Sequence, residues 1–340
     1  MFDDPASDSG RGAAAVQTLP QPTEQPGRGR RVVVTGAAGF VGTHTCRALA
    51  ADGWRVLALV RDPVSAAERL GHMPVEIRVG DMHDAPYLRS SIDGAYAVVH
   101  LAAVAIERGA DSFQSVNVEA TRNVLDAAKA ARVAHFIHMS QNGSDSSSPH
   151  RFLQSKGVAQ DMVVASGLEW TVLRPSVIFG PEDAFINVLA RIVRLTPLVL
   201  PLPGNGRSRF QPVAVDDIAH VIARALADET TRGSMYPLGG PAPLSLRDIA
   251  ARVLIAMNVS RQIVSVPTAA MRPLVAALSH VLPRPPVTPE LLDTLVIDNT
   301  VPDNTITSVF GITPTPCAPE ELLYLRRITV SGALGALFKS

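Results

Sequence analysis

Hydrophobic and polar positions follow a regular order from about residue 30 to residue 180. Short apolar runs rich in β-branched residues occupy positions 31–35, 54–60, 75–79, 95–101, 136–139 and 170–173. Such runs are typical of strands that are buried on both faces of a parallel sheet. Between them lie segments with apolar residues at helical spacing, at 43–52, at 116–131 and around Lys156 as far as about Ser166. This alternation predicts an α/β fold with a doubly wound parallel sheet.

A glycine-rich turn follows the first predicted strand at once, and a helix and a second strand come next. In that context Gly36 makes the tight turn, Gly39 lets the backbone approach a pyrophosphate, and Gly42 lets the helix pack against the strand. The helix N-terminus then faces the phosphates with free N–H groups. The arrangement predicts a dinucleotide-binding domain of the Rossmann type, with a phosphate site formed by Gly36, Ala38, Gly39, Phe40, Val41 and Gly42.

The end of the second predicted strand bears on the choice between NAD and NADP. A carboxylate there accepts hydrogen bonds from the ribose hydroxyls of NAD, whereas an arginine pairs with the 2′-phosphate of NADP. Arg61 comes first after the strand, and Asp62 precedes Pro63, which is typical of a helix-cap residue that points elsewhere. We therefore predict NADP, with NAD and a solvent-exposed Arg61 as the alternative.

Two further strands end in small or polar residues. Parallel strands bring such residues to one carboxyl edge, where ligands bind in doubly wound sheets. The residues expected to contact the cofactor at this edge are Asp81, Met82, Leu101, Ala102 and Ala103.

The remaining chain predicts the domain organisation. Residues 1–29 are rich in Asp, Ser, Gly and Pro and are expected to form a disordered tail. The cofactor domain is expected over 30–180, with a return at about 209–235 that includes a helix over 218–226 capped by Asp216 or Asp217. A smaller C-terminal α+β lobe is expected over 181–208 and 236–330, where Ser245 and Asp248 fit a capping box. Residues 331–340 are expected to be a tail.

Composition and charge narrow the function classes. The 340 residues are 46% hydrophobic and 18% charged, which suits a globular chain, and 31 basic residues balance 31 acidic ones. A net charge of zero argues against nucleic acid as a partner. Cys46 and Cys317 lack the spacing of a metal site or a disulfide framework, so no metal and a cytoplasmic location are expected.

Apolar segments bear on membrane contact. No run approaches the ~18 apolar residues of a membrane-spanning helix. The apolar, proline-bounded segment from Thr268 to Pro286 fits the cover of a hydrophobic cleft, a dimer face or a peripheral contact with a membrane. The sequence leaves these three alternatives open.

Several motifs together resemble a known family. They are Thr35-Gly36-x-x-Gly39-x-x-Gly42, His100-Leu101-Ala102-Ala103, Asn117-Val118-x-x-Thr121-x-Asn123-Val124 and Leu173-Arg174-Pro175-Ser176-Val177-Ile178-Phe179-Gly180-Pro181. In this order they are similar to the extended or atypical short-chain dehydrogenases/reductases, of the NAD-dependent epimerase/dehydratase type, over residues 31 to about 330. The stretch Gly180-Pro181-Glu182-Asp183-x-Phe185-x-Asn187 and the run Asp298-Asn299-Thr300-Val301 resemble the branch of the nucleotide-binding accessory subunit of respiratory complex I. The resemblance adds Lys156, Pro175 and Val177 to the expected cofactor contacts and makes contact with a respiratory complex an expectation.

The family's catalytic pair is only half present. Its pattern is Y-x-x-x-K, and the match here reads Phe152-Leu153-Gln154-Ser155-Lys156. A benzyl ring has no exchangeable proton, so Phe152 cannot serve as a general acid or base. The family's serine falls at Ser140 or Gln141, and His150 is a candidate substitute acid because a histidine titrates in the useful range.

Two functions remain open at this stage. The first is a protein that holds NADP(H) as a structural or sensing ligand with little or no turnover. The alternative is an NADP-dependent oxidoreductase or epimerase acting on a small sugar-, lipid- or quinone-like hydroxyl or carbonyl compound, with the proton supplied by His150, Ser140 or water. Arg207 and Arg209 are candidates to face such a substrate or to form a solvated rim.

Overall fold

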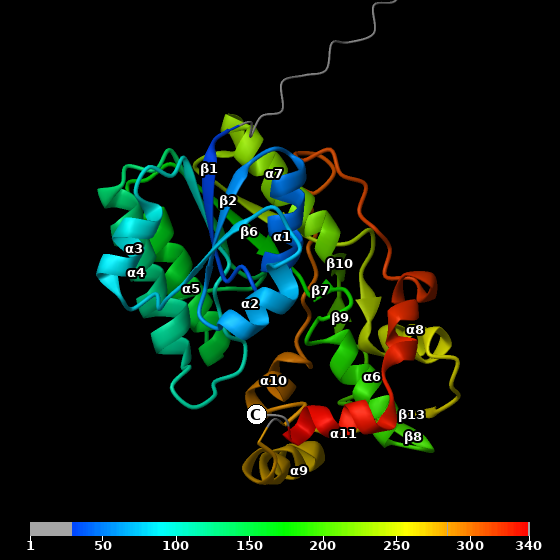
Figure 1. The fold of residues 1–340 in the computed structure, drawn as a ribbon. Coiled ribbons are helices and arrows are strands. Elements are labelled where there is room, and N and C mark those ends of the chain that lie inside the picture. Colours follow the sequence, from blue (N-terminus) through cyan, green and yellow to red (C-terminus); the bar gives the residue numbers. More distant parts are fainter. Residues whose placement is uncertain (1–28, 284, 339–340) are drawn as a thin grey trace, which may run out of the picture.

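The structure, a computed structural model, describes residues 29–283 and 285–338. The segment expected to be a disordered tail therefore lies outside the described residues, except for Gly29. A parallel sheet of seven strands forms the centre of the described chain (Figure 1). Its strands, in spatial order, are β11 (Ser234–Leu238), β6 (Trp170–Pro175), β5 (His135–Met139), β4 (Ala97–His100), β1 (Arg31–Thr35), β2 (Arg55–Val60) and β3 (Glu76–Val79).

Alternation along the strands builds two cores. In β1, Val32 and Val34 face one core and Val33 faces the other. Because successive side chains of a strand point to opposite faces, a fully apolar strand needs helices on both sides. One face carries α1 (Phe40–Ala51), α2 (Pro63–Leu70) and α7 (Val215–Ala227). The other carries α3 (Ala85–Ile92), α4 (Ala120–Ala130) and α5 (Arg151–Val164). This is the predicted doubly wound sheet.

The chain reverses its direction of growth between β1 and β4, which are neighbours in the sheet. The connections after these two strands leave toward opposite sides, so a crevice opens at their carboxyl ends. A π-helical turn, η1 (Phe113–Glu119), precedes α4. The single helix predicted over 116–131 is thus a π-helix followed by an α-helix.

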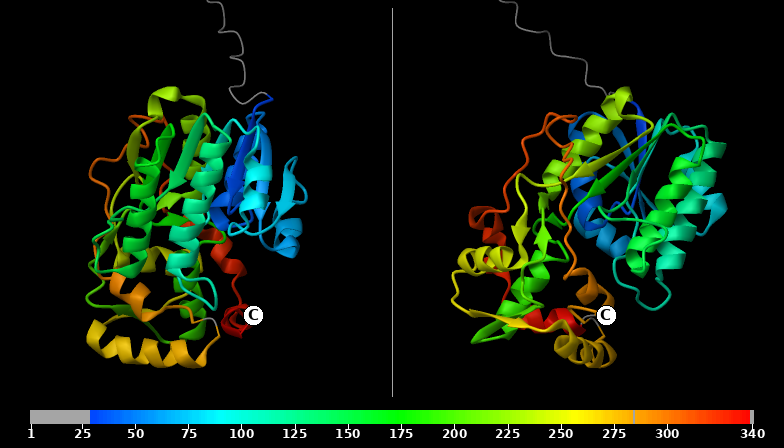
Figure 2. Two further views of the ribbon diagram at one scale, coloured as in Figure 1. Left: turned by 90° about the vertical axis from the view of Figure 1, so that its left-hand side faces the viewer. Right: turned by 180° about the vertical axis from the view of Figure 1, so that it is seen from behind.

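A smaller lobe follows β6 and has its own apolar core. Its strands form three pairs: β7 (Ile178–Phe179) with β10 (Val213–Ala214), β9 (Arg209–Phe210) with β12 (Leu244–Ser245), and β8 (Val199–Pro203) with β13 (Gln262–Val266). Its helices are α6 (Ile186–Leu195), α8 (Leu246–Ala256), α9 (Thr268–Val281), α10 (Pro289–Thr294) and α11 (Val330–Phe338), together with the 3₁₀ segment η3 (Pro319–Arg327). A second 3₁₀ segment, η2 (Glu229–Thr231), links α7 to β11 of the main sheet. Figures 1 and 2 show α9 and α10 at the end of the molecule opposite to the start of β1.

The structure changes three details of the predicted organisation. The main sheet extends past residue 236, because β11 runs to Leu238 beside β6, and Ile306 and Phe310 join the core of the cofactor domain. The described part of the expected tail 331–340 belongs to α11, which lies against α6.

The third correction concerns the start of α7. This helix begins at Val215 after Ala214, so the expectation that Asp216 or Asp217 is its N-cap was wrong. Asp216 instead pairs with His44 of α1 at 2.5 Å, and Asp217 accepts hydrogen bonds from Thr315. The capping box of Ser245 and Asp248 is confirmed at the start of α8.

Candidate functional site

The glycine turn between β1 and α1 has the tight geometry that its sequence predicts. Gly36 has φ of 65°, and a Cβ there would lie 2.8 Å from the backbone nitrogen of Ala102. At Gly42 a Cβ would lie 2.1 Å from the carbonyl oxygen of Gly36. Gly39 is the N-cap of α1, and a Cβ there meets only the Gly36 oxygen, at 3.0 Å. Gly36 and Gly42 are thus required by the fold, whereas Gly39 leaves its outer side open to a ligand.

A cavity of about 510 Å³ lies against this turn at the carboxyl edge of β1, β2, β3 and β4. Free N–H groups at the N-terminus of α1 suit a phosphate there. Twelve of the fifteen expected cofactor contacts line the cavity: Gly36, Ala38, Gly39, Phe40, Val41, Gly42, Arg61, Asp81, Met82, Leu101, Ala102 and Ala103.

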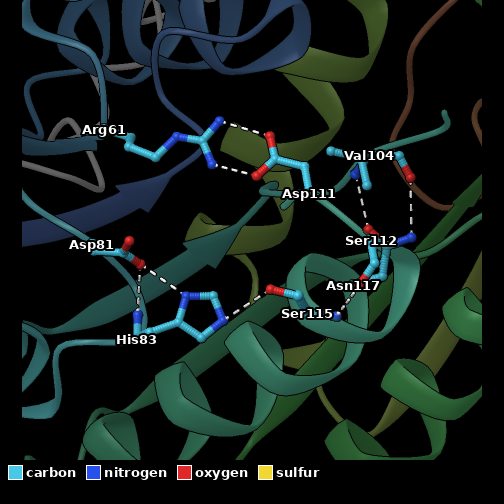
Figure 3. A network of polar contacts seen from close by, with 8 residues as sticks. All are labelled: Arg61, Asp81, His83, Val104, Asp111, Ser112, Ser115 and Asn117. Carbon is cyan, nitrogen blue, oxygen red and sulfur yellow. Dashed lines mark hydrogen bonds and ion pairs between the residues drawn. The ribbon is translucent and has the colours of Figure 1, made fainter. Parts of the chain in front are cut away.

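A polar network lines this cavity where β2 and β3 end (Figure 3). Arg61 donates two hydrogen bonds to the carboxylate of Asp111, at 2.6 and 2.8 Å. Asp81 accepts from the backbone N–H of His83 at 2.8 Å and lies 2.8 Å from its ring. The contacts with Arg61 lower the pKa of Asp111, and those with His83 lower the pKa of Asp81. Asp62, as predicted, points elsewhere and caps α2 by accepting from Val64 and Ser65.

The loop that carries Asp111 is held in place by Asn117 of η1. The Asn117 amide accepts from the backbone N–H of Val104 at 2.8 Å and donates to its carbonyl at 3.0 Å. The same amide donates to Ser155 on α5 at 2.9 Å. The buried Asn117 thus ties the wall of the cofactor cavity to the helix that carries Phe152 and Lys156.

A second cavity, of about 560 Å³, adjoins the first and shares Phe40 and Ala105 with it. Phe152, His150, Gln141 and Val177 are among its lining residues. Phe152 lies at the place where the family's phenol is expected, and its ring packs against Phe113 with centroids 5.8 Å apart. The predicted cofactor contact Val177 therefore faces this second cavity, whereas Pro175 is buried at the end of β6.

Lys156 lies deeper than its expected role implies. It is buried, and its Nζ donates to the carbonyl of Met139 at 2.5 Å. Burial lowers its pKa from 10.5 to about 8. Beside it, the rings of His100 and His138 stack with centroids 5.5 Å apart. Burial, and then the charge of Lys156, lower the pKa of His100 to about 3 and that of His138 well below its ordinary value.

The proposed proton donors differ in position. His150 is half-buried at the start of α5 and lines the second cavity. Ser140 is buried, and its hydroxyl lacks a hydrogen-bond partner in the described chain. Arg207 and Arg209 are exposed, and the neighbouring Phe210 is the residue that lines the cavity.

Sequence reasoning missed part of both cavities. His83 also lines the first cavity, and its position directly after the predicted Asp81 and Met82 could have indicated this. Asp111 carried no signal, because it lies in an irregular loop 50 residues from Arg61. Asp298 and Asn299 line the second cavity from a distant segment. The sequence marked that segment only as part of a family resemblance.

Comparison with known proteins agrees with this geometry. A subunit named NADH dehydrogenase (ubiquinone) 1 alpha subcomplex subunit 9, mitochondrial, from Arabidopsis thaliana is 31% identical over 226 residues, covering 64% of this chain and 55% of that protein. A protein of Caulobacter vibrioides named ceramide reductase is 35% identical over 189 residues, covering 55% of this chain and 58% of that protein. The chain thus spans little more than half the length of these two relatives.

The fold has close solved counterparts. The crystal structure of a UDP-glucuronic acid 4-epimerase from Bacillus cereus, in complex with UDP-glucuronic acid and NAD, superposes with a TM-score of 0.69. It is 19% identical and covers 87% of this chain and 98% of that one, so the likeness is one of fold.

The family model described as NAD(P)H-binding matches residues 36–229, which include the glycine turn, Arg61, Phe152 and Lys156. The chain belongs to this NAD(P)H-binding family, within the extended short-chain dehydrogenase/reductase superfamily and near its complex I accessory-subunit branch.

Proposed function

We propose that the protein binds NADP(H) as a structural or sensing ligand and has little or no dehydrogenase turnover. The observation that carries the proposal is Phe152, which lines the cavity beside the cofactor cavity where a phenol would be needed. Gln141 lines the same cavity, and His150 is the one histidine among its described lining residues. The glycine turn expected to bind the phosphates is present, whereas phenylalanine replaces the family's proton donor. This combination favours cofactor binding over catalysis.

The preference for NADP rests on Arg61. Its side chain is 67% exposed and lines the cavity at the end of β2. A 2′-phosphate carries more charge than a carboxylate and accepts a bidentate guanidinium. In the proposed complex Arg61 turns from Asp111 to this phosphate. Asp81 and Asp111 oppose the same phosphate, so the preference is expected to be moderate.

A second candidate function is an NADP-dependent reductase for a small carbonyl compound. The observation that favours it is the second cavity, which offers room of about 560 Å³ for a substrate next to the cofactor cavity. In that case His150 or a water molecule supplies the proton. The relative named ceramide reductase fits this candidate, and the complex I subunit fits the first.

Bound NADPH would be the hydride donor, and bound NADP⁺ the hydride acceptor, in any reaction that the protein catalyses. The residues of this chain hold its phosphates at the turn from Gly36 to Gly42, and Lys156 is the group proposed to reach its nicotinamide ribose. The hydrogen bond to the carbonyl of Met139 uses one of the three N–H donors of the ammonium, which leaves two for such a contact.

Titration of the purified protein with NADPH and NADH tests the proposal, followed by NADPH oxidation against a panel of aldehydes, ketones and quinones. We expect NADPH binding in the micromolar range or tighter and no oxidation above the rate without protein. Fast oxidation of NADPH with any panel member would overturn the binding role and establish the reductase.

We also propose a cytoplasmic location, with a peripheral contact to a membrane or a respiratory complex as the alternative. Among the described residues, no helix combines the length and apolar character needed to cross a bilayer. Cell fractionation distinguishes a cytoplasmic location from a peripheral membrane contact, and co-purification tests the contact with a respiratory complex.

A further inference from the structure

A third cavity, in the smaller lobe, adjoins the one beside Phe152. It measures about 300 Å³ and shares Ala184, Phe185, Leu291 and Leu295 with the second cavity. Three spaces therefore adjoin in series: the cofactor cavity, the cavity beside Phe152 and this third cavity. The third lies among α6, β8, α9 and α10, at the end of the molecule where Figure 1 shows α9 and α10.

The described lining of the third cavity is entirely apolar. All of the lining residues that the structure describes are Ala, Val, Leu, Ile, Met, Phe or Pro. Water gains no hydrogen bonds in such a space, and native interiors rarely keep apolar voids of this size. Its volume is about twice that of the ~150 Å³ engineered cavity that holds benzene, which leaves room for on the order of ten carbon atoms.

The cover of this cavity is incomplete. Of the residues of α9, only Val275 is buried. Leu274 and Leu278 line the cavity, yet they are 61% and 39% exposed. A ligand in the cavity would take apolar surface of both leucines out of water, which is the main source of affinity for apolar groups.

The second cavity has polar as well as apolar lining residues, and these indicate the chemistry of the other end of the ligand. It combines the apolar walls with amide and hydroxyl groups, among them Gln141, Asn142 and Thr294. Asp298 and Glu290 are also present, and none of its described lining residues is Lys or Arg. An anionic group would meet repulsion there, whereas a neutral amide or hydroxyl group can form hydrogen bonds.

We propose that the third cavity binds the alkyl chain of a neutral amphiphile of about ten carbons, whose amide- or hydroxyl-bearing head lies in the cavity beside Phe152. This inference rests on the proposed function only in placing the head next to bound NADP(H). The ligand is a substrate if the protein is an oxidoreductase and the head also carries a ketone that accepts hydride from NADPH or a hydroxyl group that is oxidised by NADP⁺. It is a second ligand if the protein is a sensor.

The test is a chain-length series on the full protein saturated with NADPH. N-acylethanolamines with acyl chains of 4 to 14 carbons, kept below their critical micelle concentrations, are titrated by calorimetry. We expect each added methylene to tighten binding about fourfold, with a plateau near ten carbons. Fatty acids of equal length, fully ionised at pH 8, should bind at least tenfold more weakly.

Two variants locate the chain. Ala270 and Ala184 are both exposed residues that line the third cavity, so a tryptophan at either site fills the space without disturbing a core. Ala270→Trp should move the plateau to shorter chains, and Ala184→Trp should weaken all chains beyond about four carbons. Ala130→Trp, at an exposed position of α4, is the matched control and should change nothing.

The outcomes separate the two proposals. Affinity that is independent of chain length, or that rises without saturation as on a membrane-like surface, overturns the alkyl-chain site while NADPH binding stands. An unchanged plateau in Ala270→Trp also overturns it. If the unaltered protein does not bind NADPH, the proposed function is overturned, and the same chain-length series without NADPH then tests the alkyl-chain site: a plateau near ten carbons supports it, and its absence overturns it.

Discussion

Arg61 and Asp111 form a two-point ion pair at the edge of the cofactor cavity where β2 ends, although 50 residues separate them. Arg61 directly follows β2, and Asp111 lies in the loop between β4 and η1. The geometry is the one that a guanidinium adopts with a phosphate. In the proposed NADP complex, Asp111 would therefore occupy the place that the 2′-phosphate needs and would compete with it for Arg61.

This competition predicts that Asp111→Asn strengthens the preference for NADPH. Loss of the carboxylate frees Arg61 and removes a repulsive charge, so the Kd for NADPH should fall about tenfold, while that for NADH changes little. Arg61→Ala should remove most of the gap between the two cofactors. Asp93→Asn removes an exposed charge at the opposite edge of the sheet and is the control. Equal affinities of the unaltered protein for NADPH and NADH would contradict the NADP proposal.

Substitution of Gly39 separates binding from folding. A valine there faces the open side of the turn, where the pyrophosphate must approach, so we expect the Kd for both cofactors to rise at least tenfold with the Tm nearly unchanged. Gly42→Val is the contrasting variant, because its side chain would overlap the carbonyl of Gly36 and lower the Tm strongly. Calorimetry and thermal unfolding measure the two effects. Normal cofactor binding by Gly39→Val would place the phosphates elsewhere.

The buried histidines predict a loss of stability in mild acid. His138 has a folded-state pKa well below 6.5, so the unfolded chain binds more protons at pH 5 than the folded chain does. The free energy of unfolding therefore falls as the pH drops below about 6.5, by roughly 2 kcal/mol between pH 7 and pH 5 for each such histidine.

His138→Phe tests this explanation. Neither ring nitrogen of His138 has a hydrogen-bond partner in the described chain, so phenylalanine loses no bond and should reduce the acid sensitivity without a cost at pH 7. His135→Phe is the matched comparison, because it also loses the 2.8 Å contact with Thr171 and should cost about 1 kcal/mol at pH 7. Urea unfolding at pH 7 and pH 5 provides both values. An unchanged pH dependence in His138→Phe would show that this ring is protonated in the folded state.

The sequence predicted these features of the cofactor domain because each depends on residues that are close together in the chain. The strand predicted at 31–35 has the bounds of β1, and the glycine turn is adjacent to it in sequence. The cap role of Asp62 followed from Pro63 alone. In each case the residues that interact lie within a few positions of one another.

The parts that sequence reasoning missed depend on contacts between distant segments. Asp216 and Asp217 have the composition of a helix cap, but their partners His44 and Thr315 lie far away in sequence, and these contacts fix both aspartates within the first turn of α7. The third cavity is formed by α6, β8, α9 and α10, and no local pattern shows that their apolar faces leave a space between them.

The meaning of Phe152 is open to a direct test by Phe152→Tyr. Phe152 and Lys156 lie four residues apart on α5, hence on the same side of the helix, and the new hydroxyl would enter the cavity that also holds His150. If the site is a reductase that lacks only its phenol, NADPH oxidation with some carbonyl compound should rise by roughly 10²-fold or more. Phe152→Leu changes the ring without adding a hydroxyl and is the control. No gain in Phe152→Tyr, with NADPH still bound, supports the structural or sensing role. The rate of the unaltered protein must be measured first, because turnover there would show that Phe152 does not prevent useful chemistry and that another group, with His150 the first candidate, supplies the proton.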